Sequence, residues 1–143
     1  MTSKTKEDLE NAIRKKGWDF NEFVGFLTKF KEIVDTGKLA EFYCKILFNL
    51  RPTSRNYGFD AIDQENKKVE IKHRFYSGKT PPGMEMDLNT IDYVLYVDLD
   101  KDDLLPKQIL KIKSEDIIRR TKGKRVSFKK AIKERKAELV FQG

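Results

Sequence analysis

The chain has 143 residues, of which 38% are hydrophobic and 37% are charged, and its formal net charge is +7. This length suits one domain with a packed interior, and ten Phe and five Tyr exclude a disordered composition. With one Cys and one His, the chain cannot form an internal disulfide or a zinc cluster of His and Cys ligands. The positive charge suits a polyanionic partner, and it is equally compatible with a role in solubility alone.

The sequence also bears on location. No apolar run approaches the length of a membrane span, and the first residues are not followed by the apolar segment of a secretory signal. We therefore expect a protein of the reducing cytoplasm that does not engage a membrane. We expect a single domain over residues 1–143, with N-terminal helices in 1–36, a core in 37–120, and a C-terminal helix and tail in 121–143.

Three helices are predicted before residue 51. Residues 6–16 form a short charged helix, and Asp19 followed by Glu22 has the spacing of a capping box that opens a second helix reaching about residue 35. The Phe-rich stripe of this second helix is expected to lie in the core. Gly37 is expected to break the chain, and residues 38–50 form a third helix in which Cys44 is a small buried residue.

Two polar features belong to this third helix and to the segment that follows it. Glu41 precedes Lys45 by four residues, in the order favoured for a surface ion pair. Residues 51–56 are predicted as a loop, in which Arg51 and Arg55 either clasp phosphates through their planar guanidinium groups or serve as ordinary solvated loop residues.

The most informative stretch covers residues 57–75. Residues 58–63 and 69–75 alternate as half-buried strands, and the polar residues 64–68 form the turn between them. Side chains two apart share a strand face, so Glu70, Lys72 and Arg74 point the same way, and an antiparallel hairpin brings Asp60 to the first two. Two carboxylates beside an ammonium suit a hard divalent cation, and the lysine can position or help deprotonate a water.

The segment Gly58-Phe59-Asp60-Ala61, followed by Glu70-Ile71-Lys72, resembles the PD-(D/E)xK motif of the restriction-endonuclease-like nucleases. Phe59 stands where the motif has Pro, a position without a chemical role. The resemblance implies a Mg²⁺- or Mn²⁺-dependent endonuclease that hydrolyses DNA phosphodiester bonds. It implies metal ligation by Asp60, Glu70 and the Ile71 carbonyl, and activation of the attacking water by Lys72.

The resemblance extends to the preceding helix and to the fold. Glu41 resembles the Glu that completes the metal site from this helix in many members of the family, so it is either a metal ligand and catalytic residue or a surface pair with Lys45. The implied fold is α/β, with a central mixed or antiparallel sheet of about four strands flanked by helices. Cutting both strands of a duplex would be simplest for a homodimer.

Other interpretations of the same residues remain open. A surface hairpin with one wet face also places Glu opposite Lys, without any catalytic role. The chain is then a non-catalytic DNA-binding module on the same scaffold, or a subunit of a larger nuclease assembly. A protein-interaction domain with incidental charge is a third class. His73 is expected to be structural, and Arg74 is expected to contact DNA because it shares a strand face with Lys72.

The second half of the chain alternates strands with short polar segments. Residues 76–89 are predicted as a loop, 92–99 as a central strand covered on both faces, 100–103 as an acidic turn and 107–113 as an outer strand. The short link between the last two strands predicts a hairpin, which departs from the crossover usual in the nuclease family. Helices are predicted at 114–120 and 127–138, and Lys124 and Arg125 in the basic loop between them are candidate phosphate contacts.

Overall fold

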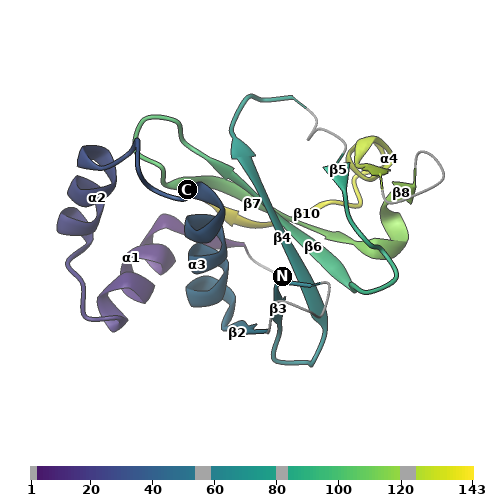
Figure 1. The fold of residues 1–143 in the computed structure, drawn as a ribbon, viewed down its shortest axis with the longest axis horizontal. Helices are drawn as coiled ribbons and strands as arrows, with labels where there is room; N and C mark the ends of the chain where they lie inside the picture. The colour runs from purple at the N-terminus through teal and green to yellow at the C-terminus, as the bar shows by residue number, and fades with distance from the viewer. Residues whose placement is uncertain (1–2, 54–58, 80–83, 120–124) are drawn as a thin grey trace.

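The computed structural model describes residues 3–53, 59–79, 84–119 and 125–143, which are organised around a mixed sheet (Figure 1). The helices in these residues are α1 (Lys6–Lys15), α2 (Phe20–Lys29), α3 (Thr36–Phe48) and α4 (Lys129–Lys133), with a 3-10 turn at Ser114–Asp116. The strands are β1 (Lys4–Thr5), β2 (Arg51–Pro52), β3 (Ala61–Ile62), β4 (Lys68–Phe75), β5 (Met84–Glu85), β6 (Tyr93–Leu99), β7 (Pro106–Lys113), β8 (Ile118–Arg119), β9 (Arg125–Ser127) and β10 (Glu138–Gln142).

The large sheet has the strand order β1-β10-β7-β6-β4-β3-β2, and a small second sheet has the order β5-β9-β8. β4 runs parallel to β6, whereas β7 runs antiparallel to it. Every residue of β6 is buried, which confirms the prediction of a central strand covered on both faces. The predicted hairpin between this strand and the next is also confirmed, because β6 and β7 pair antiparallel across the short turn that follows Leu99.

This architecture overturns the predicted fold of about four central strands flanked by helices. The described strands form a curled sheet of seven, because both ends of the chain add to it. β1 pairs with β10 in parallel, and β10 pairs with β7. Residues 107–113, predicted as an outer strand, therefore lie inside the sheet, and the predicted tail supplies most of β10. Residues 51–52, predicted as a loop, form β2, and a strand of two residues has no alternation from which it can be predicted.

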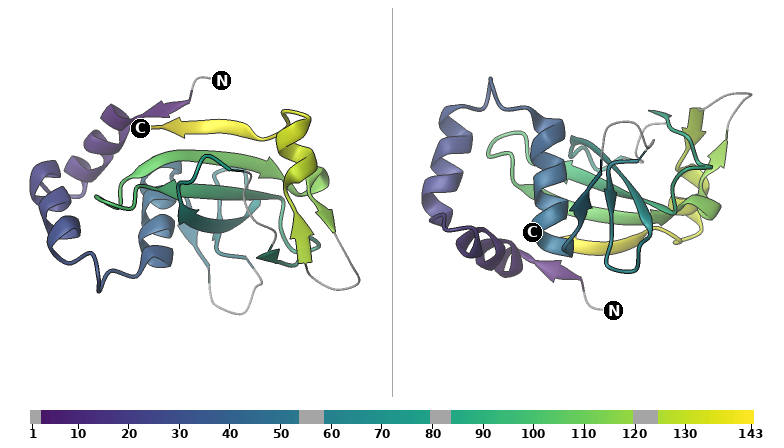
Figure 2. Two further views of the ribbon diagram at one scale, coloured as in Figure 1. Left: turned by 90° about the horizontal axis from the view of Figure 1, so that it is seen from above. Right: turned by 60° about the horizontal axis from the view of Figure 1, so that its bottom comes forward.

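Different parts of the chain cover the two faces of the central strands. Val69, Ile71 and Leu95 belong to a core shared with α1, α2 and α3. Tyr96 lies on the other face and packs in a second core with the small sheet and α4, where its ring meets that of Phe128 edge to face with centroids 5.5 Å apart. The first three helices and α4 accordingly lie at opposite ends of the molecule (Figure 2).

Side-chain caps set the helix starts. The carboxylate of Asp19 accepts the N–H of Glu22 at 3.2 Å, as predicted for the start of α2. At α3 the carboxylate of Asp35 accepts the N–H of Lys38 at 3.1 Å. Gly37 therefore lies within the first turn of α3 and does not break the chain, so the helix begins earlier than predicted.

Three helix predictions are wrong in extent. α2 ends at Lys29, so the far end of its predicted apolar stripe is not in the core: Phe30 is 36% exposed and Ile33 is 78% exposed. Residues 114–119 form a 3-10 turn and then β8 instead of a helix. The helix predicted over 127–138 is reduced to the five residues of α4, because the chain turns there into β10.

Candidate metal-binding and catalytic site

The candidate site is built on the hairpin formed by β3 and β4. The strands are antiparallel with Ala61 opposite Val69. Asp60, which precedes Ala61, therefore lies beside Glu70, which follows Val69. The N–H of Asp60 donates to the carbonyl of Val69 at 2.9 Å. A carboxylate oxygen of Asp60 accepts the N–H of Ile71 at 2.7 Å. These two bonds hold the Asp60 side chain against β4.

Alternation along β4 separates core residues from chemically active ones. Val69 and Ile71 are buried, whereas Glu70 and Lys72 are only partly exposed. The parallel register with β6 sets Lys72 next to Tyr96. β6 pairs with β4 from Val69 to Phe75, whereas β3 pairs only with Lys68 and Val69, so β6 fixes the backbone that carries Glu70 and Lys72.

The carboxyl of Glu70 has a pKa raised from 4.5 to about 8. Burial is the largest cause, since it disfavours the charged form. A hydrogen bond with the Asp60 side chain and the negative charge of Asp60 raise this pKa further, while the ammonium of Lys72 opposes the shift. The structure therefore brings Asp60, Glu70 and Lys72 together. With this pKa, the Glu70 carboxyl retains its proton at neutral pH.

Glu41, on α3, lies close to this pair of acids. Burial raises the pKa of its carboxyl, and the charge of Asp60 raises it further; Glu41 in turn raises the pKa of Glu70. Glu41 also lies 4.0 Å from the ammonium of Lys45, so the ion-pair interpretation has a geometric basis as well. In the part of the chain that the structure describes, no three carboxylate, imidazole or thiol side chains converge to hold one metal ion.

The donor atoms that do converge suit a hard cation. Mg²⁺ is commonly held by one or two carboxylates, with water on its remaining positions. Asp60 and Glu70 provide two adjacent carboxylates, and the carbonyl of Ile71 belongs to the strand residue between Glu70 and Lys72. Carboxylate and carbonyl oxygens of this kind are ligands that Mg²⁺ and Mn²⁺ accept.

His73 connects this strand to α3. Its ring Nε2 lies 3.0 Å from the hydroxyl of Thr36, in the first turn of the helix that carries Glu41. Burial lowers the pKa of His73, and the carboxylate of Asp35 partly offsets that effect. His73 therefore has the structural role predicted for it, with Thr36 as its partner. The sequence did not predict this contact, because the third helix was expected to start at residue 38, after Thr36.

Arg74 is held by partners within the protein. Its Nε donates to the carboxylate of Asp98 at 2.6 Å, and one of its terminal nitrogens donates to the carbonyl of Lys79 at 2.5 Å. Asp98 is fully buried and also accepts from the side-chain amide of Gln108 at 2.7 Å. Arg74 shares the strand face of Lys72, as predicted, but its guanidinium group is bound within this network.

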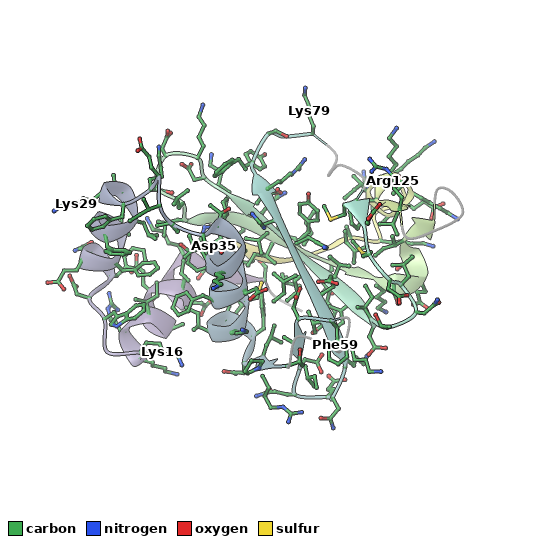
Figure 3. All side chains as sticks on the ribbon, viewed as in Figure 1. Lys16, Lys29, Asp35, Phe59, Lys79 and Arg125 are labelled. Carbon is green, nitrogen blue, oxygen red and sulfur yellow. The ribbon has the colours of Figure 1, made fainter. Side chains whose placement is uncertain are left out.

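The other predicted DNA contacts are scattered. Arg51 is exposed on β2 and donates to the side-chain carbonyl of Asn66 at 2.9 Å. Arg125 is exposed at the start of β9, on the small sheet far from α1 to α3 (Figure 3). Arg55 and Lys124 lie outside the described residues. Cys44 is fully buried, as predicted, and burial raises the pKa of its thiol well above the ordinary value.

No family model matches the sequence, and a search of curated proteins finds no match. None of the helices in the described ranges is both long and apolar enough to cross a membrane.

Proposed function

We propose that this chain is a Mg²⁺- or Mn²⁺-dependent endonuclease that hydrolyses DNA phosphodiester bonds. The observation that carries the proposal is the pairing of Asp60 with Glu70 across a fixed hairpin, with Lys72 two residues further along β4. The site and not the fold supports this function, since the overall fold differs from the one that the motif implies. The resemblance to the PD-(D/E)xK motif agrees with the same assignment.

Each residue of the hairpin has a separate task in this proposal. Asp60 and Glu70 hold the cation with the Ile71 carbonyl, and the 2.7 Å bond from the Ile71 N–H keeps the Asp60 carboxylate in place. Bound there, a divalent cation supplies positive charge that offsets the charge developing on the phosphate and lowers the pKa of a coordinated water. The ammonium of Lys72, beside Glu70, orients the attacking water.

Glu41 acts from α3, close to the acidic pair. It stands near Asp60 and Glu70 without completing a group of three ligands, so we assign it the orientation of a water in the site. The ammonium of Lys45, 4.0 Å from the Glu41 carboxylate, compensates part of its negative charge. The link from His73 to Thr36 holds α3, and with it Glu41, in register with β4.

DNA is the proposed substrate because of the charge of the whole chain and the exposed cations on its surface. A net charge of +7 favours a phosphate backbone, since each contact releases counterions. Arg51 and Arg125 are exposed and belong to the proposed contact surface, with Arg55 and Lys124. We further propose that the active form in the cytoplasm is a homodimer, which sedimentation at several protein concentrations would test.

Cleavage of plasmid DNA in Mg²⁺ or Mn²⁺ tests the proposal. We expect Lys72→Ala to lower the cleavage rate by about 10²- to 10⁴-fold, the range for a lost proton-transfer or positioning group. DNA binding measured in EDTA should stay within about threefold of the wild type, since one of many cations is lost. Lys67→Ala is the matched control, because Lys67 is an exposed lysine in the turn of the same hairpin.

The alternatives give different results in the same assay. Wild-type protein that binds DNA but cuts neither supercoiled, linear nor branched forms would indicate a binding module or a subunit that needs partners. Protein that shows no salt-dependent DNA binding would point to an interaction domain with incidental charge. Cleavage that Lys72→Ala leaves unchanged would remove the hairpin from the mechanism.

A further inference from the structure

A basic hollow of about 670 Å³ lies between α1 and α3. It is lined by lysines from three elements and by side-chain amides, while its acidic lining is limited to Asp8. The lysines are Lys4, Lys15, Lys16 and Lys45, and the amides are Asn11 and Asn49. Four ammonium groups around one concave surface concentrate positive potential, because a cleft focuses the field of the charges along its walls.

Among the described residues, the positive charge of the hollow is compensated only in part, since Lys45 is the lysine that pairs with a carboxylate, that of Glu41 at 4.0 Å. The Asp8 carboxylate is occupied at the start of α1, where it accepts the N–H of Thr5 at 2.7 Å in a capping box. Neither Lys15 nor Lys16 forms an ion pair with another described residue. Lys15 lies in the last turn of α1, Lys16 is its C-cap, and Lys45 lies in the last turn of α3, so all three favour the helix dipoles, which attract these lysines without neutralising their charge.

Lys45 connects the hollow to the candidate site. Glu41 and Lys45 are four residues apart on α3, the spacing that puts side chains on one face of a helix, and Asn49 is the C-cap just beyond the last residue of α3. Lys45 contacts Glu41 on one side and lines the hollow on the other. At 1.5 Å per residue, Asn49 lies about 12 Å from Glu41 along the axis, which is the rise of about three to four nucleotides of a duplex strand.

We propose that this hollow binds the phosphodiester backbone of the nucleic-acid substrate, about three to four nucleotides from the bond that is cut. The identity of the ligand rests on the proposed function, whereas the binding surface is defined by its own charge and shape. The lysines contact phosphate oxygens, and the amides of Asn11 and Asn49 donate hydrogen bonds to them. The surface differs from the basic segment near Arg125, since Lys16 and Arg125 lie at opposite ends of the molecule (Figure 3).

The test compares two double variants that lose the same charge at opposite ends of the protein. Lys15→Gln with Lys16→Gln removes two exposed cations from the hollow, and Lys129→Gln with Lys130→Gln removes two exposed cations from α4. Binding of a fluorescent 30-base-pair duplex is measured in EDTA between about 50 and 200 mM salt, where cleavage does not interfere. Circular dichroism checks that both variants keep the wild-type fold.

The hollow variant should bind roughly tenfold more weakly, and the slope of log K against log salt should fall by about 1.8, which is 0.9 for each lost phosphate contact. The α4 variant should match the wild type within about twofold. Equal slopes for the two variants, or a wild type that does not bind the duplex, would overturn the proposal.

The outcome separates this proposal from the nuclease assignment. If the wild type cuts DNA while the hollow variant keeps its affinity and slope, the nuclease proposal is supported and the proposal that the hollow binds the DNA backbone is wrong. If the wild type does not cut but the hollow variant loses affinity and slope, the hollow binds the DNA backbone and the nuclease proposal is wrong.

Discussion

The protonation of Glu70 is the residue-scale feature from which the chemistry of the site follows. Its carboxyl is partly buried and lies beside the charged Asp60, so placing a second negative charge there is unfavourable. The ammonium of Lys72 offsets only part of this cost, and the pKa of Glu70 remains near 8. Two adjacent acids of this kind either retain a proton or take up a cation, and a divalent cation satisfies both carboxylates together.

Glu70 should therefore make the folded protein less stable as the pH rises. In the unfolded chain its carboxyl ionises near 4.5, whereas in the folded protein it ionises near 8, so its stabilising contribution is complete below 4.5 and is lost as pH rises through 8. Glu70→Gln has no such loss and keeps a donor for Asp60. We expect the variant to melt several degrees above the wild type at pH 8.5 in EDTA and close to it at pH 4.5.

Thermal unfolding followed by circular dichroism at both pH values is the measurement. Glu65→Gln, on the exposed turn of the same hairpin, is the matched control and should follow the wild type at each pH. A difference between Glu70→Gln and wild type that is the same at both pH values would contradict the coupling between Asp60 and Glu70.

Arg74 and Asp98 lead to a second prediction at this scale. Asp98 is fully buried, and Arg74 Nε lies 2.6 Å from its carboxylate. Removing the guanidinium leaves a buried charge without its cation, so Arg74→Ala should lower the free energy of unfolding by about 3 to 5 kcal/mol. Lys107→Ala removes a cation 3.5 Å from Asp100 at the surface and should cost less than about 1 kcal/mol.

Urea denaturation at pH 7 measures both changes. A loss of DNA affinity by Arg74→Ala without a loss of stability would restore the DNA contact that its strand position suggested. Because Arg74 and Gln108 both bind Asp98, we expect Arg74→Ala to lower stability strongly and to change DNA affinity little.

At the scale of elements, the sequence was informative where side chains alternate over several residues. β4 and β6 were both placed correctly, because seven or eight residues are enough to show alternation or continuous burial. The strand predicted over residues 58–63 is shorter in the structure, where β3 covers Ala61–Ile62. β1, β2 and β5 also have two residues each, and they exist because neighbouring strands supply their hydrogen bonds. Non-local pairing of this kind leaves no periodic signal in the segment itself.

The site was more predictable than the fold for the same reason. Asp60, Glu70 and Lys72 come from one hairpin whose turn and register are local, so their convergence follows from spacing. The contact of His73 with Thr36 depends on a helix start set by the Asp35 cap, and the engagement of Arg74 depends on Asp98 in another strand. These tertiary partners cannot be predicted from a strand pattern alone.

β10 provides a prediction at the scale of elements, because the sequence suggested a tail where the structure has an internal strand. Phe141 is fully buried in the main core, whereas Leu139 on the same strand is 37% exposed. Phe141→Ala should lower the free energy of unfolding by about 3 to 5 kcal/mol, and Leu139→Ala should cost about 1 kcal/mol or less. Urea denaturation of both variants is the measurement, and equal small effects would mean that β10 is not part of the fold in solution.

The whole molecule joins its two ends in one sheet. β1, at the start of the described residues, pairs with β10 near their end, and β10 pairs in turn with β7 at the centre of the fold. The hairpin with the candidate site belongs to the same sheet through β4 and β6. Since small proteins usually unfold cooperatively, a ligand bound at the hairpin should stabilise the entire sheet.

Metal binding should therefore appear as a pH-dependent gain in global stability. The cation competes with the proton of Glu70, whose pKa is about 8, so the apparent affinity should rise about 50-fold between pH 6 and pH 8. With Mn²⁺ well above its dissociation constant at both pH values, the gain in the free energy of unfolding should be larger at pH 8 by about 2 kcal/mol.

Two measurements test this coupling together. Thermal unfolding with and without Mn²⁺ gives the gain at each pH, and titration calorimetry in two buffers of different ionisation enthalpy gives the proton release, expected to be about one proton at pH 7. Asp60→Asn and Glu70→Gln should each abolish most of the gain, while Glu65→Gln should retain it. If Mn²⁺ stabilises all four proteins equally, the cation binds elsewhere; if it stabilises none, the paired carboxyls hold only a proton and the nuclease proposal fails at its metal site.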